Sequence, residues 1–98
     1  MKDFILGSTM SAYRIVALPG DGTGREVMRE ALKVLDVIQE HGPVDFDIRE
    51  IPCGGQHYLE TGEQWPEGSF EICRDQSDAI LLGAIGWPDA RLPNGDVA

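Results

Sequence analysis

The sequence has few basic side chains, few aromatic side chains and no long apolar run. Eight Lys and Arg stand against 17 Asp and Glu, which gives a formal net charge of −9 at pH 7. An acidic surface repels the phosphates of nucleic acids and of anionic membranes. No stretch is apolar for long enough to span a bilayer, and the N-terminal run Phe4-Ile5-Leu6 is too short for a signal peptide. We therefore expect binding to neither nucleic acid nor membrane.

Cysteine is also scarce. The two cysteines, Cys53 and Cys73, match no zinc-binding spacing, and a lone pair is poor evidence for a disulfide framework. Reduced thiols are typical of a cytoplasmic protein. The 98 residues, 42% of them hydrophobic, can form at most one small domain. We expect a flexible leader over residues 1–12 and one folded segment over residues 13–98.

The most informative stretch is the glycine-rich run Pro19-Gly20-Asp21-Gly22-Thr23-Gly24-Arg25-Glu26-Val27. It lies between a strand-like and a helix-like segment, where an α/β fold binds nucleotides. The N–H groups and dipole at the start of the helix suit an anion such as phosphate. The spacing is G-x-G-x-G, however, and Arg25 stands where the dinucleotide fingerprint G-x-G-x-x-G has its last glycine. A glycine turn that binds no ligand is therefore an open alternative.

A helix is predicted after this loop, ending near Gly42-Pro43. Thr23 and Glu26 have the spacing of a capping box. The helix carries an apolar stripe opposite a polar face. The stripe comprises Val27, Ala31, Val34 and Ile38, widened by Met28, Leu32 and Leu35.

The remaining segments alternate between strand and helix. Residues 13–18 read as a buried strand, 44–51 as a half-exposed strand, and 79–84 as a buried parallel strand. A helical turn is predicted over 56–60 and a short helix from Pro66 to about Arg74, with Phe70 and Cys73 facing inward.

This order predicts an α/β fold of three layers, with parallel strands joined by right-handed crossovers. Glycine loops follow both Leu18 and Leu82. Because the carboxyl ends of parallel strands share one edge, we expect the two loops to lie together and to form a ligand site.

Four ordered blocks of sequence resemble the isocitrate/isopropylmalate dehydrogenase family, the β-decarboxylating dehydrogenases. The blocks are LPGDGTGREV at 18–27, ALKVL at 31–35, Gly54-Gly55 followed by Thr61-Gly62-Glu63, and DAILLGAIG at 78–86. The resemblance covers residues 13–89 and is greatest to the isopropylmalate branch. Trp87-Pro88-Asp89 is also similar to the tartrate and D-malate branch.

The resemblance implies an NAD-dependent oxidative decarboxylation of a small 2-hydroxy acid, assisted by Mg²⁺ or Mn²⁺, in a homodimer. For the isopropylmalate branch it implies a role in leucine biosynthesis. The family's substrate arginines, its proton-transferring Tyr and Lys and its metal-binding aspartates follow the position equivalent to Ala98. No catalytic or metal-binding residue is therefore assigned here. We expect an N-terminal fragment, an incomplete domain that is inactive alone.

The resemblance also assigns contacts with the cofactor. Thr23 stands at a position near the adenine end of NAD, and the loop after the last strand matches the start of an NAD-contacting loop. The residues expected to bind the cofactor are Thr23, Gly86, Trp87, Pro88 and Asp89.

Other functions stay open. Tartrate, D-malate or isocitrate is an alternative substrate, and a flavodoxin-like module that binds a nucleotide or a protein without catalysis is an alternative class. Asp21 is expected to bond nearby N–H groups as a turn former. His57 and Tyr58 are expected on a short helical turn, partly buried for packing.

Overall fold

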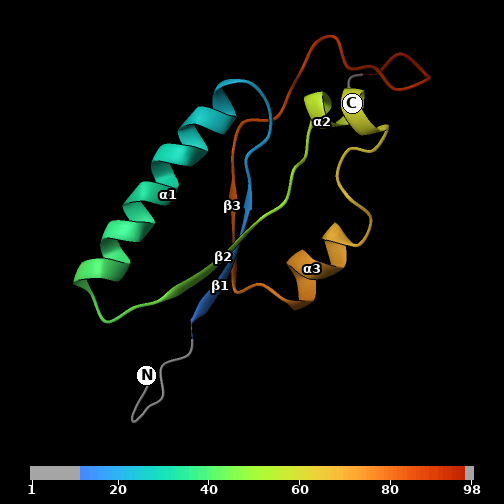
Figure 1. Cartoon of the computed structure of the whole chain (residues 1–98). Helices are drawn as coiled ribbons and strands as arrows, with labels where there is room; N and C mark the ends of the chain where they lie inside the picture. Colours follow the sequence, from blue (N-terminus) through green and yellow to red (C-terminus); the bar gives the residue numbers. More distant parts are fainter. Residues whose placement is uncertain (1–11, 97–98) are drawn as a thin grey trace.

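The computed structural model describes residues 12–96, so the predicted leader lies outside the described residues except for Ala12. Figure 1 shows how strands and helices alternate along the chain. In chain order the elements are β1 (Tyr13–Leu18), α1 (Thr23–His41), β2 (Phe46–Glu50), α2 (Gly55–Thr61), α3 (Ser69–Asp75) and β3 (Ala79–Leu82). The predicted order of elements is confirmed. The third and sixth elements are shorter than predicted, and α3 begins three residues after Pro66.

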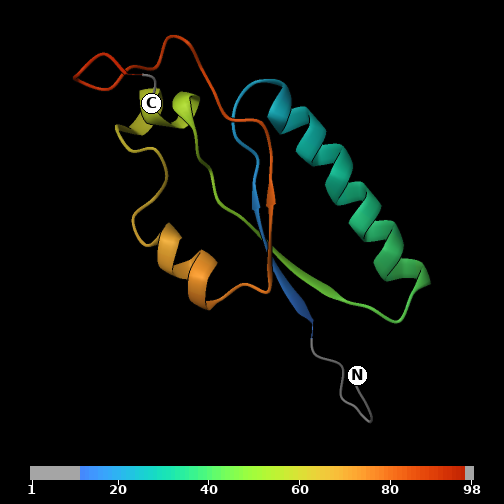
Figure 2. The same cartoon turned by 180° about the vertical axis from the view of Figure 1, so that it is seen from behind.

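The strands form one parallel sheet in the order β2-β1-β3. Ile15 of the central strand pairs with Ile48 on one side and Ala79 on the other. Helix α1 lies on one side of the sheet, and α2 and α3 lie on the other (Figures 1 and 2). The predicted three-layer α/β arrangement is confirmed, because each connection between successive strands contains a helix and the helices cover both sides of the sheet.

The core lies between the sheet and α3. It comprises the buried side chains of Val16, Leu18, Ile51 and Cys53, against which Trp65, Ile72 and Cys73 pack. The inward position predicted for Cys73 is confirmed. Burying such side chains stabilises the fold by roughly 1.5–3 kcal/mol for each large one.

Phe70 does not face inward as predicted; it is 55% exposed. Its ring lies 5.4 Å from the guanidinium carbon of Arg74, one turn further along α3. Only the side of this seven-residue helix that carries Ile72 and Cys73 reaches the core. The exposed ring instead makes a cation–π contact with Arg74 at the surface.

The predicted capping box at the start of α1 is wrong. Thr23 is the first helical residue, Gly22 is the N-cap, and no side chain caps the helix. The backbone supplies the cap instead: Gly24 N–H donates to the Asp21 carbonyl at 2.8 Å, and Arg25 N–H to the Gly22 carbonyl at 3.1 Å. A threonine inside the helix cannot take the place of the residue before it.

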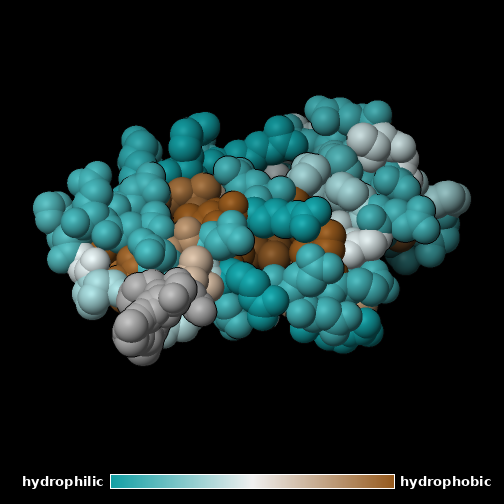
Figure 3. Space-filling view, turned by 60° about the horizontal axis from the view of Figure 1, so that its bottom comes forward, coloured by the Kyte–Doolittle hydropathy of each residue, from teal (hydrophilic) through white to brown (hydrophobic). Residues whose placement is uncertain are grey.

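Large apolar side chains remain uncovered within residues 12–96. In α1, Met28 is buried, whereas Val27 and Val34 are 64% and 58% exposed. The prediction that 79–84 is a buried strand is wrong, since Ile80 is 51% exposed in β3. The edge position of β3 is the reason, because no described strand pairs with its outer side. Figure 3 shows apolar surface between hydrophilic residues.

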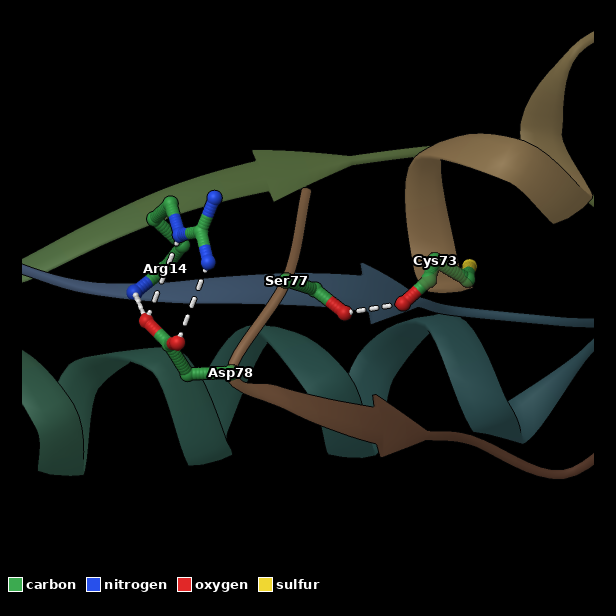
Figure 4. A network of polar contacts seen from close by, with 4 residues as sticks. All are labelled: Arg14, Cys73, Ser77 and Asp78. Carbon is green, nitrogen blue, oxygen red and sulfur yellow. Dashed lines mark hydrogen bonds and ion pairs between the residues drawn. The ribbon is translucent and has the colours of Figure 1, made fainter. Parts of the chain in front are cut away.

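An ion pair fixes the start of β3 against β1 (Figure 4). Arg14 N–H donates to Asp78 Oδ2 at 2.8 Å, and the Arg14 guanidinium lies 3.2 Å from Asp78 Oδ1. Asp78 N–H donates in return to the Arg14 carbonyl at 2.7 Å. The hydrogen-bonded guanidinium holds the pKa of Asp78 below its usual value. These contacts set the register of the strand that leads to the second glycine loop.

Candidate functional site

Two loops meet at the carboxyl ends of the strands. Gly83 N–H donates to the Leu18 carbonyl at 2.8 Å, and Asp21 N–H donates to the Ala84 carbonyl at 2.8 Å. The loop after β1 and the loop after β3 are therefore joined through their backbones. The prediction that the two loops share one edge is confirmed. We call this edge, formed by residues 19–24 and 83–90, the rim.

The glycine spacing of the first loop serves contact with the second. Gly20 has φ +79°, and a Cβ there would overlap the Ala84 carbonyl. A Cβ on Gly24 would lie 2.6 Å from the same carbonyl oxygen, and one on Gly22 would lie 3.3 Å from the Trp87 ring. The departure from G-x-G-x-x-G thus has a structural reason, because each glycine allows a close approach by the second loop.

Asp21 organises the rim. Its carboxylate is buried, with the residue 3% exposed, and it accepts three backbone hydrogen bonds. Gln56 N–H donates to Oδ1 at 2.8 Å, and Gly55 and Gly86 N–H donate to Oδ2 at 2.9 and 2.8 Å. The prediction of local bonds is wrong, since the donors lie 34, 35 and 65 residues away in sequence.

Burial pulls the pKa of Asp21 upward, but the N–H donors of Gln56, Gly55 and Gly86 and the charge of Arg25 outweigh it. The net pKa lies below the ordinary aspartate value. Hydrogen bonds to the charged form have this effect because protonation weakens them. The carboxylate is therefore suited to remain charged inside the rim.

The start of helix α2 packs against both loops of the rim. Gly54 has φ +103°, and a Cβ there would lie 2.7 Å from the Asp21 carboxylate oxygens. A Cβ on Gly55 would lie 2.7 Å from Trp87 Cβ. Gln56 Oε1 accepts a hydrogen bond from Gly22 N–H at 2.8 Å. No sequence pattern marks Gln56 as a rim residue, and the adjacent Gly54-Gly55 pair is the one signal of close packing here.

The residues predicted to bind the cofactor lie at or next to the rim. Thr23 is exposed in the first turn of α1, and Gly86, Pro88 and Asp89 are exposed. Trp87 is half-buried beside Gly22, and its carbonyl accepts a hydrogen bond from Ala90 N–H at 3.0 Å. The structure brings Gly86 and Trp87 to the loop before Thr23. Their contact with a cofactor stays a prediction.

A cleft of about 520 Å³ lies beside the rim. Arg25, Arg29, Glu50, Cys53 and His57 are among its lining residues. Within residues 12–96, the buried His57 Nε2 has no hydrogen-bond partner. Burial raises the pKa of the Cys53 thiol, so it is not an activated nucleophile. His57 and Tyr58 lie half-buried on α2, as predicted.

The described part of the chain contains neither a membrane-spanning helix nor a metal-binding cluster. None of its helices is both long and apolar enough to cross a membrane. It brings together no group of three or more His, Cys, Asp or Glu side chains that could hold a metal ion. Both cysteines are free thiols.

Comparison with known proteins agrees with this architecture. A family model described as isocitrate/isopropylmalate dehydrogenase matches residues 14–96. The 3-isopropylmalate dehydrogenase of Aquifex aeolicus (strain VF5) is 48% identical over 79 residues, which cover 81% of this chain and 21% of that protein. The corresponding protein of Trichormus variabilis is 47% identical over 74 residues, covering 76% and 20%.

A solved β-decarboxylating dehydrogenase from Thermococcus kodakarensis, in its apo form, is also similar. It has a TM-score of 0.63 and 36% sequence identity, covering 83% of this chain and 23% of that one. The family model, the two curated relatives and the solved structure are all named as dehydrogenases. The chain belongs to the isocitrate/isopropylmalate dehydrogenase family. It spans about one fifth of the length of the curated relatives it matches.

Proposed function

We propose that this chain supplies the cofactor-binding rim of an NAD-dependent oxidative decarboxylase of a 2-hydroxy acid, most similar to 3-isopropylmalate dehydrogenase. The observation that supports it best is that two glycine loops are hydrogen-bonded to each other at one edge of a parallel sheet. α/β folds bind nucleotides at this edge. The names of the relatives support the reaction class.

The exposed part of the rim fits a dinucleotide. Gly86 has φ +151°, and nothing lies within 4 Å of the position of a Cβ, so the backbone there is open to a ligand. Thr23 is exposed at the positive end of the α1 dipole. In this proposal Thr23 and residues 86–89 bind and orient NAD. Bound NAD would supply the hydride acceptor for oxidation of the hydroxyl carbon, the chemistry that precedes loss of carbon dioxide.

Unlike the cofactor, the metal ion has no candidate binding site among the described residues. Residues 12–96 offer no cluster of ligands that fits Mg²⁺ or Mn²⁺, so no step is assigned to the ion here. The resemblance places metal, catalytic and substrate residues in polypeptide beyond this chain. A homodimeric, cytoplasmic enzyme of leucine biosynthesis, of which this chain is an N-terminal fragment, is part of the same proposal.

Titration of the ¹⁵N-labelled chain with NAD tests the site. We expect shifts of the amide signals over residues 20–24 and 86–89. Gly86→Ala and Gly95→Ala form a matched pair, because both glycines have positive φ and open space around a Cβ. Gly86→Ala should weaken NAD binding, and Gly95→Ala should not. Shifts confined to the cleft around His57, or equal effects of the two variants, would contradict the proposal.

Turnover tests the rest of the proposal. Residues 1–98 should not reduce NAD in the presence of 3-isopropylmalate and Mn²⁺, because the catalytic groups are assigned elsewhere. Clear turnover would refute the fragment hypothesis. Trp87-Pro88-Asp89 favours a second candidate, a tartrate or D-malate enzyme. A panel of 2-hydroxy acids assayed with the protein of full family length would separate the two.

A further inference from the structure

We propose that Asp21 is a positioning residue, whose buried carboxylate holds the Gly86–Asp89 segment in the place where it meets the cofactor. The role in cofactor binding rests on the proposed function. The connection, by which we mean the hydrogen bonds that Asp21 accepts from Gly55, Gln56 and Gly86, rests on the geometry alone. Asp21 touches no ligand in this role. It acts through the backbone of three other residues.

The connection depends on one shared oxygen. Asp21 Oδ2 accepts from Gly55 N–H at 2.9 Å and from Gly86 N–H at 2.8 Å, while Oδ1 accepts from Gln56 N–H at 2.8 Å. The start of α2 and the second loop are thus tied to the same carboxylate. Hydrogen bonds to an ionised acceptor are short and roughly twice as strong as neutral ones.

The backbone–backbone hydrogen bonds between the two described loops stop short of residues 86–89. The bond from Gly83 N–H to Leu18 and the bond from Asp21 N–H to Ala84 hold the loop only as far as Ala84. The bond from Gly86 N–H to the Asp21 side chain is the next one along the chain. Losing it removes the hydrogen bond that holds Gly86, while Trp87 still packs beside Gly22 and Gly55 and β3 stays paired.

The site selects aspartate over its close analogues. An asparagine keeps one acceptor oxygen and loses the charge, so it cannot satisfy all three donors. A glutamate carries one more methylene group, and the carboxylate already lies against Gly54, where a Cβ would be only 2.7 Å away. The lack of a side chain at Gly54 is what admits the aspartate.

The first test uses the unmodified chain. Three backbone amides donate to the single carboxylate of Asp21, which lies near the charge of Arg25 and the thiol of Cys53. The amide signals of Gly55, Gln56 and Gly86 should therefore shift together on acidification, with one midpoint below the ordinary aspartate value of about 3.9. Separate midpoints, or no shift at Gly86, would overturn the connection.

The second test compares Asp21→Asn with Asp36→Asn, a control that removes the same charge from an exposed position on α1. For Asp21→Asn we expect amide exchange at Gly86 to rise about tenfold or more, because a charge-assisted hydrogen bond is lost. The dissociation constant of NAD should rise about tenfold, while exchange at Val16 in β1 is unchanged. The control should change neither quantity.

The outcomes separate this inference from the proposed function. Faster exchange at Gly86 with unchanged NAD affinity would overturn the positioning role. A native chain that binds no NAD would overturn the proposed function and the positioning role, and the acid titration would still decide whether the connection exists. If Asp21→Asn does not fold, the acid titration and NAD affinity of the native chain across that midpoint give the same comparison.

Discussion

Gly24→Ala probes the close approach of the second loop to α1. A Cβ at this position would lie 2.6 Å from the Ala84 carbonyl oxygen and 2.7 Å from the Pro19 carbonyl oxygen. Both neighbours are backbone atoms and cannot rotate away. Overpacking costs about 3 kcal/mol at the upper end of its usual range, and the better helix propensity of alanine returns about 1 kcal/mol. We therefore expect a net destabilisation of about 2 kcal/mol.

Urea unfolding followed by far-UV circular dichroism measures this difference. The midpoint should fall by about 1–2 M for a chain of this size. Asp36→Ala is the control, because Asp36 is exposed on the same helix and has only the propensity gain of about 0.5 kcal/mol. If Gly24→Ala instead stabilises the chain by about 1 kcal/mol, the propensity acts alone and the contact between Gly24 and Ala84 is absent.

Three further predictions concern charge and thiol chemistry. Folding lowers the pKa of Asp21, so the charged carboxylate should stabilise the fold fully above about pH 4, and this stabilisation should be lost as the pH falls through the folded pKa. The stability of Asp21→Asn should lack this pH dependence. A variant with the same stability-versus-pH profile as the native chain would contradict the prediction. Asp78→Asn weakens the contact with Arg14, so amide exchange at the start of β3 should speed up severalfold, with exchange in α1 as the control. A thiol reagent should modify half-buried Cys73 before buried Cys53, and the reverse order would argue against the core.

The sequence allowed prediction of the features that depend on local pattern. The apolar runs and the helical periodicity predicted each element, and the helical connections predicted parallel pairing. The shared edge of the two glycine loops followed from that topology. The residues of a short segment are enough to predict its secondary structure, and the order of the segments is enough to predict how the strands pair.

Features that depend on distant partners were not predictable. Asp21 was expected to bond locally, yet one of its donors, Gly86, is 65 residues away. Thr23 had capping-box spacing, but Gly22 takes the N-cap position because its φ of +52° lets the loop turn there. Ile80 was expected to be buried, but burial of an edge strand depends on neighbours that its own sequence does not specify.

The central place of β1 has a consequence for how the polypeptide acquires its fold. This strand is synthesised before either of its neighbours. Ile15 can pair with Ile48 only after β2 has been synthesised, and with Ala79 only after β3 has been synthesised. Contacts so distant in sequence slow folding, because the intervening chain loses entropy before any pairing rewards it. During synthesis β1 therefore has at least one unpaired edge until residues close to Leu82 have emerged, and the nascent chain is most prone to aggregation in that interval.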